Sequence, residues 1–147
     1  MRRRVLIVAN GFVNDAPQAL PAELREFAPA DSDMHVVVPM HLTRLQSLCS
    51  DIDAPRADAQ ARLDRILDDM TALGLSAKGT TADEDQLQAI EDALAEFHAQ
   101  AIVLITRVPD QQNRQERQLI ARAARFGLPV RGALITRDGT VAAPLAV

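Results

Sequence analysis

Three short stretches of the chain are almost entirely apolar, and they constrain the fold more than any other feature. They read RVLIVA (residues 4–9), MHVVV (34–38) and AIVLIT (101–106). A strand with one face in solvent alternates apolar and polar residues, whereas a strand covered on both faces of a parallel sheet is apolar throughout. These runs therefore predict central strands of a parallel sheet. Two less apolar segments, residues 75–79 and 129–136, predict the third and fifth strands.

Segments with helical signals separate these strands. Asp53 and the capping box of Thr81 and Glu84 predict helix starts, while Gly74 and Gly127 predict helix ends. The predicted helices cover residues 21–27, 42–48, 53–74, 81–98 and 114–125. Alternation of strands and helices with short loops predicts one α/β domain over residues 1–147. We expect a doubly wound, five-stranded parallel sheet in the order 3-2-1-4-5 with helices on both faces.

The end of the chain leaves two possibilities open. Arg137-Asp138-Gly139-Thr140 resembles a hairpin turn after the fifth strand. The tail VAAPLAV then either folds back on the same chain or docks on a partner. The fifth strand would be an apolar edge by topology, and an exposed apolar edge needs cover.

Composition excludes several classes of function. The net charge of −4 and pI near 5.3 argue against nucleic-acid binding. Cys49 is the only cysteine, which excludes an internal disulfide or a cysteine-based zinc site and suits a reducing cytoplasm. The chain has no Trp or Tyr to stack on a flavin or on single-stranded nucleic acid. We expect no metal and no membrane-spanning segment.

A ligand site in such a sheet lies at the carboxyl ends of strands, where the strand order reverses. The loops concerned follow strands one, two and four and cover residues 10–16, 39–43 and 107–113. This placement follows from the topology alone.

The chain resembles a universal stress protein domain. The resemblance covers nearly the whole chain and rests on RVLIVAN (residues 4–10), on residues 61–107 and on ERQLIARAARFGLPVRGALI (116–135). It implies the doubly wound fold and a homodimer that pairs through the fifth strand. It also makes ATP or AMP the ligands to consider, with the adenine held by backbone groups near Val38.

The sequence departs from the ATP-binding members of that family in two places. Those members carry glycines after strand four, where backbone N–H groups approach the triphosphate. Here the turn RVPDQQN (residues 107–113) contains no glycine, and Asn10 stands where the family has an acidic residue. The resemblance therefore implies the subgroup without the glycine motif, and we expect no cofactor.

Several residues around these loops have two interpretations. Arg107, Arg114 and Arg117 either replace the lost glycines as a guanidinium phosphate site or are solvated surface charges. Asn10 and Gly11 either face a ligand or only turn the chain out of the strand. The candidate ligand-binding residues are Asn10, Gly11, Val38, Thr106, Arg107, Asn113, Arg114 and Arg117.

No catalytic residue is predicted. A nucleophile elbow, a Walker A loop and the acidic pair of a receiver domain are all absent from the sequence. The sequence favours a non-enzymatic regulatory or stress-response domain that is not a tight ATP binder. The alternative is a module for ATP, AMP or a cyclic nucleotide with a phosphate site built from arginines.

Overall fold

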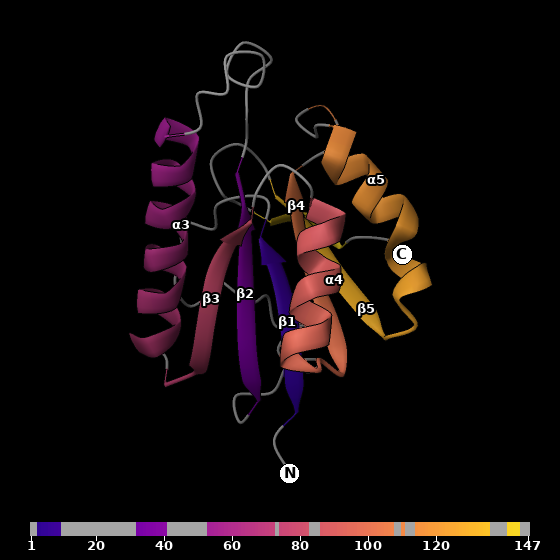
Figure 1. Ribbon diagram of the computed structural model, residues 1–147, viewed down its shortest axis with the longest axis horizontal. Coiled ribbons are helices and arrows are strands. Elements are labelled where there is room, and N and C mark those ends of the chain that lie inside the picture. Colours follow the sequence, from indigo (N-terminus) through magenta and orange to yellow (C-terminus); the bar gives the residue numbers. More distant parts are fainter. Residues whose placement is uncertain are drawn as a thin grey trace.

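A computed structural model of the chain describes eight stretches, in which the elements follow the predicted alternation (Figure 1). The described residues are 3–9, 32–40, 53–72, 74–82, 86–107, 110, 114–135 and 141–144. The strands are β1 (Arg4–Ala9), β2 (Asp33–Pro39), β3 (Ser76–Ala82), β4 (Ala101–Arg107), β5 (Val130–Ile135) and β6 (Val141–Pro144). The helices are α3 (Asp53–Ala72), α4 (Gln86–Phe97) and α5 (Arg114–Arg122), followed by a 3-10 turn, η3 (Ala123–Phe126).

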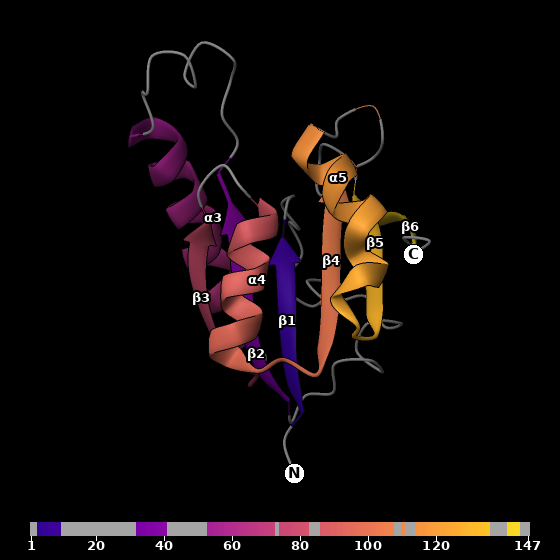
Figure 2. The ribbon, with the colours of Figure 1, turned by 45° about the vertical axis from the view of Figure 1, so that its right-hand side comes forward.

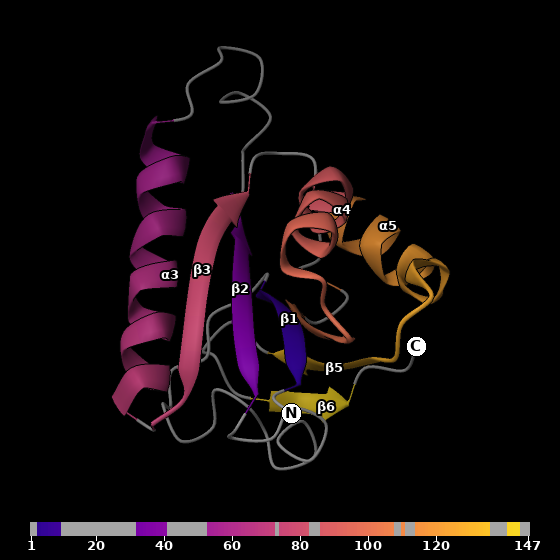
Figure 3. The same cartoon turned by 60° about the horizontal axis from the view of Figure 1, so that its bottom comes forward.

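The sheet confirms the predicted order of five parallel strands and adds a sixth strand. Its order is β3-β2-β1-β4-β5-β6, and every pair among the first five strands is parallel. β6 is antiparallel to β5 and lies beside it at the end of the sheet (Figure 3). The expectation that the fifth strand is an edge strand was therefore wrong. Of the two possibilities for the tail, the described part folds back on its own chain.

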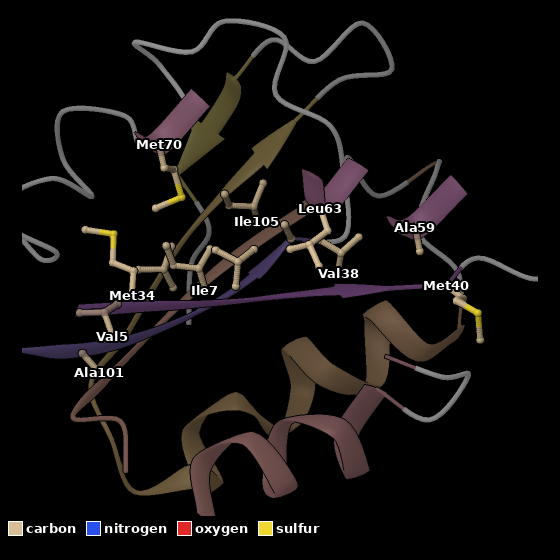
Figure 4. Packing of buried hydrophobic residues seen from close by; sticks show 13 residues of the cluster. Val5, Ile7, Met34, Val38, Met40, Ala59, Leu63, Met70, Ala101 and Ile105 are labelled. Carbon is tan, nitrogen blue, oxygen red and sulfur yellow. The ribbon is translucent and has the colours of Figure 1, made fainter. Parts of the chain in front are cut away.

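Two apolar clusters lie on the two faces of the sheet. One is formed by Val5, Ile7 and Ala9 of β1 with alternate residues of β2 and β4, packed against Leu63 and Met70 of α3. Figure 4 shows these side chains between α3 and the strands. The other is formed by the intervening strand residues, packed against α4 and α5. β1 belongs to both clusters, so the continuous apolar run in the sequence has the predicted cause.

The helix ends match the glycine signals, but one predicted helix start is wrong. Gly74 and Gly127 have left-handed backbone angles, with φ of 77° and 71°, as expected for residues that end helices. Thr81 was expected to cap α4, yet it lies in β3, where it pairs with Val38. The ladder with β2 extends β3 to Ala82, and the helix starts only at Gln86. Tertiary pairing here overrides a local capping signal.

Some predictions lie outside the described residues. They are the helices over residues 21–27 and 42–48 and the surroundings of Cys49. Among the described residues, no helix is long and apolar enough to cross a membrane.

Candidate functional site

The carboxyl ends of β1, β2 and β4 lie at one edge of the sheet, as the topology requires (Figure 2). β1 and β2 pair as far as Val8 and Val37, and β2 continues beside β3 for two more residues. The end of β2 is held on two sides. Met40 donates its backbone N–H to the carbonyl oxygen of Ala82 at 3.0 Å, and Arg62 of α3 donates to the carbonyl oxygen of Pro39 at 3.0 Å. This edge of the sheet is therefore a firm support for a ligand.

Val38 is fully buried, backbone included. Its side chain has no exposed surface and belongs to the cluster under α3. In the register of the sheet, Val38 pairs with Thr81 of β3 and extends beyond the last residue paired with β1. That backbone groups near Val38 hold an adenine stays a prediction.

Thr106 is the most unusual polar residue at this edge. Its side chain is fully buried, and its hydroxyl oxygen has no hydrogen-bond partner among the described residues. Burial of a hydroxyl without a hydrogen bond costs about 1–3 kcal/mol. Because Thr106 alternates with Ile102 and Leu104, it lies on the face that carries α4 and α5.

Two of the candidate arginines, Arg107 and Arg117, lie on different faces of the sheet. Arg107 follows Thr106, so strand alternation puts it on the α3 face, and it is half-buried. Arg117 is exposed on α5, which covers the other face. Arg114 is the first residue of α5. Arg107 and Arg117 thus extend from opposite faces of the sheet, and Asn10, Gly11 and Asn113 lie outside the described part of the chain.

A groove that the sequence analysis did not predict lies on the α4 face of β2 and β3. It runs between β3 and α4, has a volume of about 360 Å³ and contains His35 on its β2 side. The His35 ring packs near Phe97 with 5.4 Å between ring centroids, and its Nε2 lies 3.4 Å from the Thr80 hydroxyl oxygen. Burial lowers the pKa of His35 from its ordinary value of 6.5, and the nearby Glu96 carboxylate partly opposes that change.

One sequence signal for this groove exists. Gln88, Asp92 and Glu96 repeat at intervals of four residues and so share one side of a helix. Only the fold shows that this side faces a sparsely covered strand. Among the described residues, no group of three or more His, Cys, Asp or Glu side chains is placed to hold a metal ion.

Comparison with solved structures gives independent support for the fold. No family model matches the sequence, and no curated protein matches it. A solved structure of a protein from the universal stress protein family of Burkholderia pseudomallei is similar, with 26% identity and a TM-score of 0.56. The similarity covers 88% of this chain and 93% of that one.

Two further solved structures are of the universal stress protein from Archaeoglobus fulgidus. One has 17% identity and a TM-score of 0.59, over 90% of this chain and 98% of that one. The other, in complex with dAMP, has 16% identity and a TM-score of 0.59, over 88% and 96%. The chain therefore has the fold of universal stress proteins.

Proposed function

We propose that the protein is a non-enzymatic, universal stress protein-like regulatory domain that does not bind ATP tightly. The proposal includes a role in the stress response and a cytoplasmic location. The observation that carries it is the turn between β4 and α5, residues 108–113, which reads VPDQQN and has no glycine.

The physical reason is the loss of backbone donors close to the phosphates. Glycines in such a turn let N–H groups approach the triphosphate without a side chain in the way. Here every residue of the turn has a side chain, and Pro109 has no backbone N–H to donate. Asn10 removes the acidic residue expected after β1. Both changes lower the affinity expected for ATP.

A nucleotide-binding module is the second candidate, because two observations favour it. One similar structure is a complex with dAMP, a nucleotide with a single phosphate. In addition, the buried Thr106 hydroxyl, which has no hydrogen-bond partner in the described part of the chain, lies near the end of β4. If the protein is a nucleotide-binding module, the nucleoside is held by Asn10, Gly11, Asn113 and the backbone near Val38.

In the same reading the arginines that follow β4 supply the phosphate site. Arg107, Arg114 and Arg117 would hold one phosphate rather than three. Guanidinium groups make paired hydrogen bonds to phosphate oxygens and do not require glycine in the turn.

An ultraviolet spectrum tests both candidates. The chain has neither Trp nor Tyr, so it absorbs little near the adenine band. The purified protein is incubated with ATP, AMP or dAMP, desalted and recorded. We expect no retained adenine band after ATP. One adenine per chain after ATP, identified by mass spectrometry, would overturn the first proposal.

A matched variant then examines the second candidate. Thr106→Val keeps the shape of the side chain and removes only its hydroxyl. If AMP or dAMP binds in equilibrium dialysis and Thr106→Val weakens it, the hydroxyl belongs to a nucleotide site. If neither nucleotide binds at millimolar concentration, the nucleotide module is excluded.

A further inference from the structure

The groove beside α4 extends from His35 of β2 to Ala82, the last residue of β3, and lies on the face of the sheet opposite the Val38 side chain. α4 lies over β1 and β2 rather than over β3, on the face of the sheet opposite α3 (Figure 2). β3 is the outermost strand, two strands away from β1. None of the described candidate nucleotide-binding residues lines the groove, so binding there does not depend on the function proposed above.

The groove has an apolar floor and a polar wall. The wall on α4 is formed by Gln88, Asp92 and Glu96, which are all exposed, and the opposite wall includes His35 and Thr80. The floor is formed by small apolar side chains, namely Val37, Ala82, Ala89 and Ala93. A ligand that fits must carry a narrow apolar body and charged or polar groups along one side.

The charges of the groove select a cation. Asp92 and Glu96 are both carboxylates, and no Lys or Arg is among the described residues that line the groove. The nearest cation along β3 is Lys78, which pairs with His35 in the register of the sheet but does not line the groove. Asp92 is already oriented, because Gln88 donates a hydrogen bond to one of its carboxylate oxygens at 2.9 Å.

The spacing of the carboxylates adds a second constraint. Four residues of an α-helix rise about 6 Å, so Asp92 and Glu96 are separated by roughly one helical turn. Two ammonium groups joined by a chain of four methylene groups span a similar distance. A single metal ion, by contrast, needs several oxygen ligands within about 2–2.6 Å.

We infer that this groove binds a linear aliphatic diamine or polyamine. Its ammonium groups pair with Asp92 and Glu96, and its methylene chain lies on the floor formed by Val37 and the three alanines. The inference rests on the shape of the groove, the charge of its wall and the spacing of its two carboxylates. The ligand is the free amine, and a lysine side chain of a peptide is an outcome that the test distinguishes.

Nuclear magnetic resonance locates the binding through His35. The imidazole signal of His35 is identified with His35→Gln, and 1,4-diaminobutane is titrated into the intact protein at constant ionic strength. Because the Glu96 carboxylate raises the pKa of His35, an ammonium group on Glu96 lowers that pKa further. His98, which is described and does not line the groove, serves as the internal reference.

Calorimetry then measures which carboxylates matter. We expect Asp92→Asn and Glu96→Gln each to weaken binding of the diamine about fivefold, the effect of an exposed charge pair worth up to about 1 kcal/mol. Glu91→Gln is the matched control, because Glu91 is exposed on the same helix and does not line the groove. It should leave the affinity unchanged.

Three results would overturn the inference. The first is equal binding of 1,4-butanediol, which has the same length and no charge. The second is a His35 shift with magnesium chloride as large as with the diamine at matched ionic strength. The third is a loss of affinity in Glu91→Gln as large as in Glu96→Gln. Binding of a lysine-containing peptide without binding of the free diamine would also reject the free amine as the ligand.

Discussion

Gly79 lies in the middle of β3, where the strand approaches α3 too closely for any side chain. A Cβ at this position would contact Leu63 Cδ1 and would lie 2.7 Å from the carbonyl oxygen of Val36. Leu63 belongs to α3 and is buried between the helix and the sheet, so its side chain has little room to move. The glycine is therefore required by packing, not by a left-handed backbone.

The substitution Gly79→Ala tests this close approach. Overpacking of this kind lowers the free energy of unfolding by about 1 to 3 kcal/mol. Urea unfolding followed by far-ultraviolet circular dichroism measures the change, since the chain has no Trp to follow. Ser76→Ala, an exposed position of the same strand, is the control and should change stability little. Equal stability of the two variants would contradict the packing argument.

His35 makes stability depend on pH in a predictable direction. Burial lowers its pKa in the folded state below the value of 6.5, so the unfolded chain binds the proton more readily. The protein therefore loses stability as the pH falls below about 6.5, and the loss levels off below the folded pKa of His35. No change from this residue is expected above that window, because His35 is neutral in both states.

The variant His35→Gln isolates this effect. The free energy of unfolding is measured at several pH values from about 8 down to about 5 for both proteins. We expect the wild type to lose more stability than the variant on acidification. His41 and His98 remain in both proteins, so the difference in slope reports His35 alone. Parallel pH profiles would show that burial of His35 has no energetic consequence.

At the scale of elements, β6 determines what the edge of the sheet presents to other molecules. It pairs with β5 through Ile135, Leu134 and Ala133, with an irregular register between the first two. β5 thus has a neighbour on both sides at Ala133, Leu134 and Ile135. The predicted pairing of two fifth strands over these three residues requires β6 to leave first.

Deletion of residues 141–147 should convert β5 into an open edge. Open edges pair with other chains through their free backbone groups. We expect the truncated protein to associate in sedimentation more strongly than the full chain at equal concentration. Deletion of residues 145–147 alone retains β6 and is the control. A truncated protein that sediments like the control would show that β6 does not shield the edge. A strict monomer of the full chain at micromolar concentration would remove the homodimer prediction itself.

The elements also show where local sequence signals are sufficient and where they fail. Nearly continuous apolar runs in the sequence correctly predicted β1, β2 and β4, because these strands are covered on both faces. The capping box at Thr81 failed because a long-range ladder with β2 extended β3 through it. The predicted helix to Arg125 becomes a 3-10 turn after Arg122, which propensity does not distinguish from a last helical turn.

At the scale of the whole molecule, the sequence was sufficient for the fold because its alternating pattern leaves few arrangements. Right-handed crossovers and two-sided burial restrict five parallel strands to a few orders, of which 3-2-1-4-5 is one. The candidate nucleotide site was only partly predictable. Its edge follows from topology, but the buried hydroxyl of Thr106 and the opposite faces of Arg107 and Arg117 emerge only from the structure. The groove depends on where α4 lies across the sheet, which no local pattern encodes.

The central place of β1 has a consequence for synthesis of the chain. β1 pairs with β4, and at the start of these strands the hydrogen-bonded residues Arg4 and Gln100 are 96 residues apart. At translation rates of about 5–20 residues per second, β4 follows β1 out of the ribosome roughly 5–20 s later. During that interval β1 can pair with β2, but its other edge and much of both apolar faces lack their cover. The nascent chain is thus most exposed to aggregation at the strand that becomes the best protected in the finished molecule.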